Sequence, residues 1–345
     1  MSPVIGWDVG GAHLKRAVLG ADGRLQAVAI APCALWQGLD RLEAAIAGLP
    51  PAPAAPSFVT MTGELVDLWP DRATGVAALG AALAQRLGAG TLFYAGPAGF
   101  VGADRLGAHA GDIASANWHA TASALARLLP AGLLADMGST TTDLVLFADG
   151  AVRAMAYADA DRLVAGELVY TGIARTPVMA LSPALPFRGA WVPLMAEHFA
   201  TTADVYRLLE ELPEGADLHP AADGGAKTEE ASARRLLRMV GRDLEPGGLE
   251  EAGVLAAAAC EAQFGLLTRG LGRVLAASGL PDDAPLVGAG VGRGLMARLA
   301  VRAGRPFRDA GTLLADGSDD GRGLAGAAAD CAPAVAVARL GRALT

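Results

Sequence analysis

The chain has 345 residues, of which 52% are hydrophobic and 19% are charged, and its formal net charge is −8. This length permits two domains with substantial cores, and this composition excludes a largely disordered chain. The acidic balance argues against a nucleic-acid-binding protein, which usually carries a basic face.

The mean hydropathy of +0.36 raises the question of a membrane segment. No run of about 18 residues is free of charges and helix breakers, as a spanning helix requires. The N-terminus begins a strand at once, without the basic and apolar regions of a signal peptide. Three widely spaced cysteines (Cys33, Cys260 and Cys331) fit neither a zinc site nor a disulfide framework. We therefore expect a cytoplasmic protein with no membrane partner, and we leave open whether it forms a homo-oligomer.

The first 130 residues predict three antiparallel strands at 3–9, 14–20 and 25–31, joined by glycine turns. Helices and strands alternate after them. The predicted helices are 38–48, 72–87 and 115–129, and the predicted strands are 57–62 and 91–95. Ser115 is the expected N-cap of the third helix.

The same order then restarts, with predicted strands at 132–137, 142–148 and 151–157. Helices are expected at 193–198, 201–211, 228–240, 250–278, 292–303 and 325–343, and strands at 285–289 and 306–309. Glycines inside 250–278 suggest an interrupted helix. The repeated order predicts an internal duplication with one α/β domain over 1–130 and a second over 131–324. The segment 325–345 is a candidate to complete the first domain.

One segment departs from this alternation. Residues 213–227 are rich in proline, glycine and aspartate, which predicts a surface loop. The loop is either a mobile lid or a plain connection.

Residues 4–23 and 133–150 share one pattern: an apolar strand ending in Asp-x-Gly, a tight turn, a second apolar run and a closing Asp-Gly. Aligning Asp8 with Asp136 places Gly10 on Gly138. A hairpin with an acid at its mouth and backbone N–H groups in its turn can hold a phosphate and the metal that accompanies it. Two such hairpins predict two facing half-sites with one phosphorylated ligand between them.

In the first hairpin, Gly10 and Gly11 let the backbone approach an anion closely. Asp8 stands at the end of its strand, where it can hold Mg²⁺ directly or through water. Lys15 follows Asp8 by seven residues and can neutralise a phosphate as a point charge. His13 is a further candidate, although a plain turn position is the commoner role for such a residue.

The second hairpin offers a run of hydroxyl residues after Gly138, each with an O–H beside its backbone N–H; they are Ser139, Thr140, Thr141 and Thr142. Asp143 follows Asp136 by seven residues, across the turn. Two acids beside a phosphate cradle suit a metal ligand and a base. The alternative is a threonine-rich turn on a sheet surface.

Two later segments add candidates. Gly288, Ala289 and Gly290 lie between an apolar strand and a helix, which is typical of a phosphate site or of close helix–strand packing. They do not form a dinucleotide motif. Glu167 stands between two glycines after the second hairpin and is a candidate to enter the cleft.

The paired DxGG and DxGSTTTD hairpins and the late GAG strand resemble the actin, sugar kinase and Hsp70 superfamily. This resemblance implies an α/β fold of duplicated actin-like ATPase (ribonuclease H-like) domains that face a central cleft, which usually holds ATP and Mg²⁺. The strings GWDVGGAHLK, VTMTGEL, NWHATA, LLADMGSTTTD and GELVYTG are similar to hydantoinase/oxoprolinase-related proteins of tetrahydromethanopterin-linked one-carbon pathways.

The closer resemblance implies a transferase of methanofuran or methylofuran biosynthesis. It would join an aminomethylfuran-methyl diphosphate to the phenol of a tyramine, glutamyltyramine or tyrosine derivative, forming an aryl ether and pyrophosphate. Lys15 favours this branch, because true hydantoinases and oxoprolinases usually have an acid at that place. An acid would repel a diphosphate, whereas an ammonium attracts it.

In this hypothesis Mg²⁺ held by Asp8 and Asp136 bridges the diphosphate, and Lys15 and the two turns neutralise its oxygens. The phenol proton goes to Asp143 or, as a second choice, to Glu167. Two alternatives stay open: an ATP-dependent kinase or ring-opening amidase of the same superfamily, with adenosine near residues 288–290, and a non-catalytic sensor. The sequence leaves the phenolic acceptor unspecified.

Overall fold

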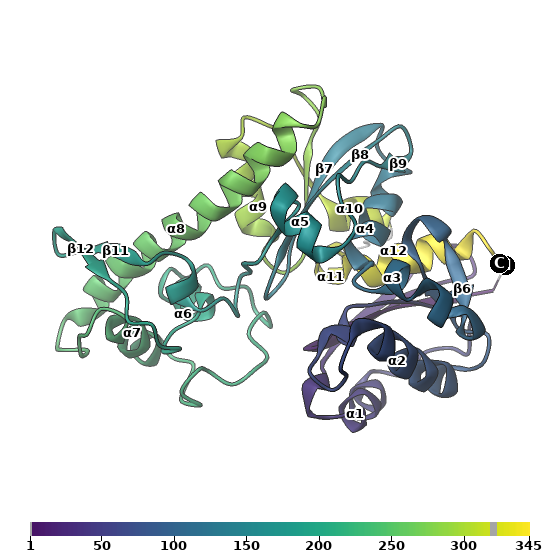
Figure 1. Cartoon of the computed structure of the whole chain (residues 1–345), viewed down its shortest axis with the longest axis horizontal. Helices are drawn as coiled ribbons and strands as arrows, with labels where there is room; N and C mark the ends of the chain where they lie inside the picture. The colour runs from purple at the N-terminus through teal and green to yellow at the C-terminus, as the bar shows by residue number, and fades with distance from the viewer. Residues whose placement is uncertain (1, 318–322) are drawn as a thin grey trace.

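In the computed structural model, which describes residues 2–317 and 323–345, two six-stranded sheets flank a layer of helices (Figure 1). The first sheet has the order β3-β2-β1-β4-β5-β6, and the second has the order β10-β8-β7-β13-β14 with β9 paired to β8. The strands of the first sheet are β1 Val4–Val9, β2 His13–Leu19, β3 Leu25–Pro32, β4 Ser57–Met61, β5 Leu92–Tyr94 and β6 Phe100–Gly102. Those of the second are β7 Ala131–Met137, β8 Thr142–Ala148, β9 Ala151–Val152, β10 Leu168–Val169, β13 Leu286–Ala289 and β14 Phe307–Asp309.

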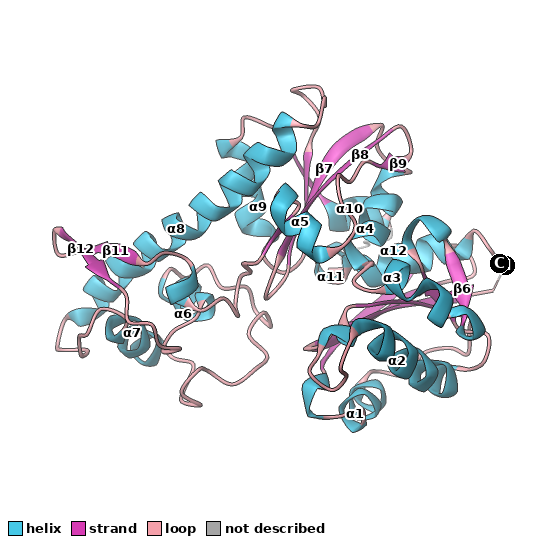
Figure 2. Ribbon diagram, in the orientation of Figure 1, coloured by secondary structure: helices cyan, strands magenta, loops and turns pink. Residues whose placement is uncertain are grey.

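The two sheets repeat one topology, as the sequence predicts. In each, three consecutive antiparallel strands come first, and two parallel strands are then added beside the first of them. A separate hairpin, β11 Ala184–Phe187 with β12 Ala190–Pro193, extends from the second lobe (Figure 2).

The helices form three groups. On the outer face of the first sheet lie α1 Asp40–Gly48 and α2 Arg72–Leu87, with α3 Ala110–Ile113 beside α2. Between the sheets lie α4 Asn117–Ala126, α10 Ala310–Ala315, α11 Leu324–Asp330 and α12 Ala332–Arg342. The remaining helices belong to the second lobe; they are α5 Asp159–Ala165, α6 Thr202–Leu208, α7 Glu229–Arg238, α8 Gly248–Ala276 and α9 Arg293–Arg302. Short 3-10 turns are η1 Leu35–Gln37, η2 Gly63–Leu65, η3 Gly96–Ala98, η4 Ala103–Arg105, η5 Gly107–His109 and η6 Val178–Ala180.

The helix α12 is the central element of the inner layer. It contacts β1, β2 and β4 of the first sheet and the helix α4, which in turn contacts β7 and β8. One hydrophobic cluster therefore joins both sheets, with Val4 and Phe58 from the first and Leu134 and Phe147 from the second. The division of the chain near residue 130 stays a prediction.

Five element predictions are wrong. Residues 193–198 are not helical, because the chain forms the β11–β12 hairpin just before them. The helix α8 is continuous despite its glycines, and the last predicted helix is two helices, α11 and α12, bent by 96°. Ser115 does not cap α4: its φ is +54°, and its hydroxyl donates to Glu64 instead. The third strand of the second copy is only Ala151–Val152.

Among the described residues, only one pair of helices meets the length and hydropathy criteria for a membrane span. No single helix there is long and apolar enough to cross a bilayer, and the bent pair α11–α12 meets the criterion by length and composition only.

Candidate functional site

The strand periodicity places four charged residues on the faces by which the two sheets approach each other. In β1, Ile5, Trp7 and Val9 belong to the outer core beneath α1 and α2, whereas Val4 belongs to the inner core. Because successive side chains of a strand alternate between faces, Asp8 shares the inner face with Val4.

The same alternation holds in the other three strands of the hairpins. In β7 and β8, Leu134 and Val145 are inner-core residues, so Asp136 and Asp143 point inward as well. In β2, Ala17 is an inner-core residue, which gives Lys15 the same direction. The two hairpins therefore present Asp8 with Lys15, and Asp136 with Asp143, toward the space between the lobes.

The two hairpin turns have matching hydrogen bonds. The Gly10 N–H donates to the His13 carbonyl at 3.0 Å, and the Gly138 N–H donates to the Thr141 carbonyl at 2.9 Å. The two residues inside each turn have backbone N–H groups that donate to no protein acceptor among the described residues; they are Gly11 and Ala12 in the first turn and Ser139 and Thr140 in the second. Successive free N–H groups in a turn form a concave site for an anion.

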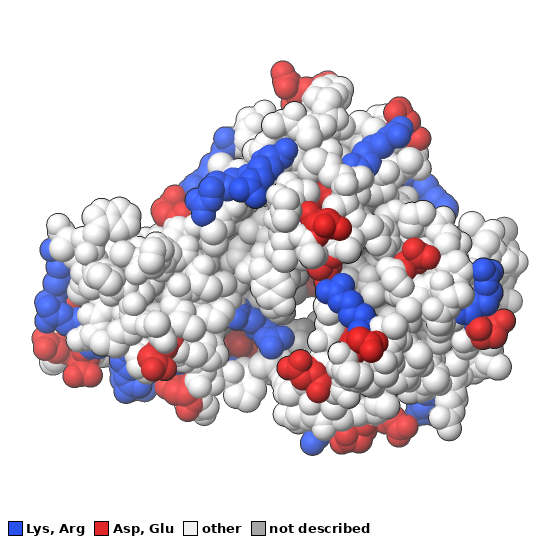
Figure 3. Space-filling model, viewed as in Figure 1, with Lys and Arg blue, Asp and Glu red and all other residues white. Residues whose placement is uncertain are grey.

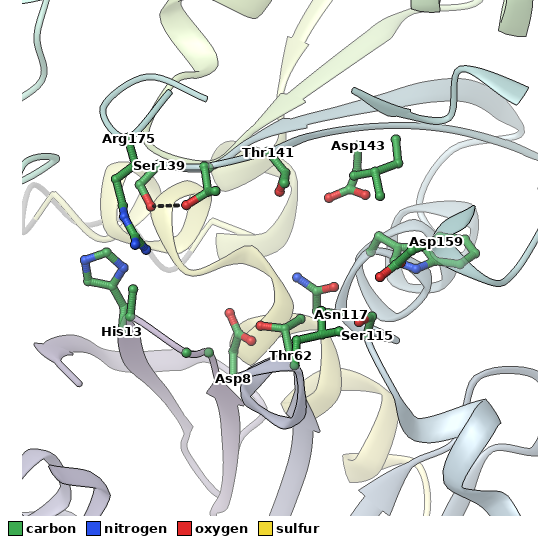
Figure 4. A pocket seen from close by; sticks show the side chains of 18 of the residues that line it. Asp8, His13, Thr62, Ser115, Asn117, Ser139, Thr141, Asp143, Asp159 and Arg175 are labelled. Atoms are coloured by element: carbon green, nitrogen blue, oxygen red, sulfur yellow. Dashed lines mark hydrogen bonds between the residues drawn. The ribbon is translucent and has the colours of Figure 1, made fainter. Parts of the chain in front are cut away.

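A cavity of about 350 Å³ lies between these turns. Figure 3 shows a hollow between the two lobes with acidic and basic side chains near it. In Figure 4, Asp8 and His13 approach the space from the first hairpin, and Ser139, Thr141 and Asp143 approach it from the second. The predicted residues that line it are Asp8, Gly10, Gly11, His13, Lys15, Gly138, Ser139, Thr140, Thr141 and Asp143.

Lys15 forms the electrostatic centre of the first hairpin. Its Nζ lies 3.6 Å from Asp8 Oδ2. Burial alone would lower the pKa of Lys15, but the carboxylates of Asp8 and Asp136 and the neighbouring Cys331 and Asp330 outweigh it and raise the pKa. The ammonium therefore stays charged at neutral pH.

The two equivalent acids respond to burial in the same direction. Burial raises the pKa of Asp8, and Lys15 only partly offsets this. Burial also raises the pKa of Asp136 to about 7, and nearby Asp143 and Asp8 add to the rise while Lys15 opposes it. Both carboxyl groups would be stabilised as anions by an added cation.

Asp143 is held by a buried arginine. Its Oδ1 accepts a hydrogen bond from Arg162 at 2.8 Å, and the Arg162 guanidinium lies 3.9 Å from the centre of the Trp118 ring. Burial raises the pKa of Asp143, and Arg162 offsets part of the rise. The other carboxylate oxygen, Oδ2, accepts no hydrogen bond from the described residues, so it is free to accept a proton.

The donor set fits a magnesium ion. Asp8 Oδ1 is buried and has no hydrogen-bond partner among the described residues, and Asp136 is the second inward carboxylate. In the described part of the chain no three His, Cys, Asp or Glu side chains gather closely enough to enclose a metal. Magnesium often needs only one or two carboxylates, with water and substrate phosphate as its other ligands.

Six predicted residues are not among those that line the cavity, and one of them is Asp136, a proposed magnesium ligand. Glu167 accepts hydrogen bonds from the backbone N–H groups of Met155 and Ala156 at 2.8 and 3.0 Å, so both of its oxygens are occupied. Thr142 points to the opposite face from Asp143, and its hydroxyl donates to the Thr171 carbonyl. The other three are Gly288, Ala289 and Gly290.

The glycine segment instead serves packing. A side chain at Gly288 would collide with Phe307, and one at Gly290, whose φ is +78°, would collide with the Met137 carbonyl and with Asp136 Oδ1. The close-packing alternative therefore describes this segment in the structure, although Gly290 does lie against the carboxylate of Asp136.

Most of the other lining residues come from segments outside the two hairpins. Thr62, Ser115 and Asn117 reach the cavity from the ends of β4 and α4. Those not in the predicted set are Ala12, Trp36, Thr62, Leu65, Val66, Ser115, Asn117, Trp118, Asp159, Arg162, Leu168, Tyr170 and Arg175. Thr62 lies at the carboxyl end of a parallel strand, where α/β folds gather ligands, and this explains its place in the lining.

The fold and the site together define two lobes with one repeated α/β sheet topology and a cavity between them, with a turn of free backbone N–H groups on each side. The sequence model of the hydantoinase/oxoprolinase family matches residues 59–304 of the chain. The chain belongs to this hydantoinase/oxoprolinase family.

Two curated relatives share the name (4-{4-[2-(gamma-L-glutamylamino)ethyl]phenoxymethyl}furan-2-yl)methanamine synthase. The protein from Methanocaldococcus jannaschii is 30% identical over 243 residues, which cover 70% of this chain and 72% of that protein. The protein from Methanococcus vannielii is 33% identical over 119 residues, which cover 34% and 53% of the two chains. Among solved structures, a ROK family glucokinase from Streptomyces griseus matches with a TM-score of 0.49 and 12% identity, over 99% of this chain and 100% of that one.

Proposed function

We propose that this protein is an enzyme of methanofuran or methylofuran biosynthesis that makes an aryl ether. It joins the furfuryl carbon of an aminomethylfuran-methyl diphosphate to the oxygen of a phenol such as glutamyltyramine or a tyrosine derivative, and releases pyrophosphate. The two relatives described above, named as synthases of such an ether, support this proposal.

The observation on which the proposal rests is the pair of facing turns. Four unused backbone N–H groups and the ammonium of Lys15 surround one cavity of about 350 Å³. A diphosphate placed between the turns would have hydrogen-bond donors on both sides, and each donor is fixed by a β-hairpin. Ser139, Thr140 and Thr141 add hydroxyl groups to one side.

The reaction exchanges one carbon–oxygen bond for another. The bond between the furfuryl carbon and the diphosphate oxygen breaks, and its electron pair leaves with pyrophosphate. The furan ring stabilises positive charge on that carbon, and the turns and Lys15 stabilise the charge that develops on the leaving group. A bond then forms between the carbon and the phenol oxygen.

Asp143 takes the phenol proton in this proposal. Its raised pKa gives it a higher proton affinity than an exposed aspartate has, and Arg162 fixes the direction of its carboxylate. Mg²⁺, held by Asp8 and Asp136, would supply further charge neutralisation on the diphosphate. The remaining task of the chain is to hold the two substrates in line.

The direct test is turnover without ATP. Purified protein with both substrates and Mg²⁺ should release pyrophosphate and form an ether of the expected mass, and Asp8→Asn should abolish both signals. Folded protein that gives no ether would contradict the proposal. Substrate-stimulated release of ADP after ATP is added would assign the cleft to an ATP-dependent reaction instead.

A further inference from the structure

Three side chains that line one side of the cavity, His13, Trp36 and Arg175, meet a fourth, His219, which packs against His13 and Trp36. We call His13, Trp36, Arg175 and His219 the mouth cluster. The ring centres of His13 and His219 lie 5.1 Å apart, those of Trp36 and His219 lie 5.4 Å apart, and the Arg175 guanidinium lies 5.6 Å from the centre of the Trp36 ring. In Figure 4, His13 from the first hairpin and Arg175 from the loop after β10 point toward each other, on the side away from Asp143 and Asp159.

Arg175 differs from the other lysine and arginine side chains that line the cavity. Lys15 is paired with Asp8, and Arg162 is paired with Asp143. Arg175 has no carboxylate partner among residues 2–317 and 323–345, although it lines the same cavity. A guanidinium held over an aromatic ring is well suited to bind an oxyanion through two parallel N–H bonds.

The backbone fixes Arg175 beside the second turn. Its N–H donates to the Ser139 carbonyl at 2.8 Å, and the N–H of the preceding Ala174 donates to the same carbonyl at 3.2 Å. The guanidinium therefore begins from a rigid point next to the proposed diphosphate cradle. A rigid starting point reduces the entropy that is lost when a ligand is bound.

Two histidine nitrogens in the mouth cluster have no partner. His13 Nε2 and His219 Nε2 are both buried without a hydrogen bond to any described residue. Burial lowers the pKa of His13 to about 3, with Lys15, His219 and Arg175 contributing, so this imidazole is neutral at physiological pH. A neutral imidazole has one N–H, which His13 can place on Nε2, whereas His219 uses its N–H in a hydrogen bond to the Ala12 backbone. Buried donors without partners are uncommon and indicate a missing acceptor.

We propose that the mouth cluster binds an oxyanion of a substrate, with the Arg175 guanidinium as its anchor, His13 Nε2 as a further donor, and His219 packed against the His13 ring to hold it in place. The identity of the substrates, though not the oxyanion site, rests on the proposed function. Two sources share this chemistry: a carboxylate on the phenolic acceptor, and the terminal phosphate of the diphosphate donor. His219 belongs to the 213–227 segment, so this one residue of the segment would help to select the substrate.

The experiment measures binding without turnover, by calorimetry on the full chain in the presence of Mg²⁺. The probes are inorganic pyrophosphate, γ-glutamyltyramine, and tyramine, which lacks the carboxylate. Arg175→Gln should bind one anionic probe about 10- to 100-fold more weakly than the wild type. Arg188→Gln is the matched control, because Arg188 pairs with Glu251 on an exposed surface of the second lobe.

The pattern of losses identifies the source. A loss for γ-glutamyltyramine with no loss for tyramine assigns the cluster to an acceptor carboxylate, and a loss for pyrophosphate assigns it to the donor. Unchanged affinity of Arg175→Gln for both anionic probes would overturn the proposal. If Arg175→Gln does not fold, the same calorimetric measurement is made on His219→Ala, which changes a residue of the 213–227 segment. Unchanged affinity of His219→Ala for both anionic probes would then overturn the proposal.

Failure of the two proposals can be told apart. If binding weakens in Arg175→Gln but the wild type forms no ether, the oxyanion site stands and the proposed reaction falls. If the wild type forms the ether and Arg175→Gln binds both anionic probes normally, the reaction stands and the mouth cluster has no part in recognition.

Discussion

Asp8 and Lys15 are directly opposite each other in the register of β1 and β2, and Lys15 Nζ lies 3.6 Å from Asp8 Oδ2. The equivalent register pair in the second hairpin is Asp136 with Asp143, so one copy has an acid and a base where the other has two acids. Because of this single difference, the two register pairs together carry one permanent cation and three carboxyl groups. It also suggests separate tasks, with anion binding on one side and proton transfer on the other.

The first prediction concerns Lys15. Lys15→Met removes the cation that faces the proposed diphosphate, and it also removes the charge that lowers the pKa of Asp8, so Asp8 binds a proton more readily. We expect kcat/KM for the diphosphate donor to fall by about 100-fold or more. Pyrophosphate release at varied donor concentration measures this.

The chain offers a matched control for this substitution. Its only other lysine is Lys227, which pairs with Asp217 at 3.3 Å and is one-third exposed. Lys227→Met should keep normal kinetics. Equal losses in the two variants would mean that Lys15 has no special role toward the donor.

The second prediction concerns Asp143 as the proton acceptor. Asp143→Asn keeps the size of the side chain and should lower kcat by about 100- to 10,000-fold. Fluorinated phenols lose their proton more easily, so they should depend less on this residue. The measurement is therefore the ratio of wild-type to variant rates across a series of phenols of falling pKa.

A purely structural role predicts a different pattern. If Asp143 only holds Arg162 in place, every phenol should lose the same factor. Asp149→Asn, at an exposed turn after the same strand, controls for the effect of removing an acid from this lobe. A constant ratio across the phenol series would contradict the assignment of Asp143 as base.

Local sequence features were enough to predict the hairpins and their acids, because the signals lie within one strand–turn–strand unit. The spacing of Asp8 and Lys15, for example, becomes a cross-strand pair once the turn forms at Gly10. The failure at Thr142 has an equally local cause. A run of hydroxyl residues continues from the turn into β8, where successive side chains face opposite sides, so Thr142 points away when Asp143 points in.

Other parts of the site depend on tertiary packing. Trp36, Arg175 and His219 lie far apart in the sequence and meet only because the two lobes fold against each other. The hairpin at 184–193 was missed for another reason. Its turn residues, Arg188 and Gly189, both have positive φ, but Arg-Gly is not among the usual signals for such a turn.

The third prediction concerns the pH dependence of stability. Glu64 is only 2% exposed, and burial raises its pKa to about 7, partly opposed by hydrogen bonds from Ser115 and from the backbone. Between its ordinary value of 4.5 and about 7, the folded protein keeps this proton and the unfolded chain loses it. The free energy of unfolding therefore falls as the pH rises through this window.

Glu64→Gln removes this titration and can still accept a hydrogen bond from Ser115. We expect the loss of stability between pH 5 and pH 8 to be smaller in Glu64→Gln than in the wild type, by on the order of 3 kcal/mol. Urea denaturation at both pH values measures this difference. Glu43→Gln, at an exposed position of α1, should leave it unchanged. A pH dependence identical to that of the wild type would show that Glu64 is not protonated in the folded state.

The last prediction concerns the contact between β1 and α12, which brings the C-terminal helix against the strand that holds Asp8. A Cβ added to Gly6 would lie 2.0 Å from the Ala334 carbonyl oxygen and 2.8 Å from Ala338 Cβ. Neither obstacle is a flexible side chain, because one is helix backbone and the other is a methyl group fixed to it. Gly6→Ala must therefore push α12 away from β1.

We expect Gly6→Ala to lower the free energy of unfolding by about 3 kcal/mol, at the upper end of the range for an overpacked core. Gly48→Ala is the matched control, because a Cβ at the end of α1 meets no atom within 4 Å. The bend before α12 lies beside Lys15, so the displaced helix should also weaken donor binding in protein that remains folded. Equal stability of the two variants would mean that α12 is not seated on β1, and the inward position of Asp8 would then lose the packing that explains it.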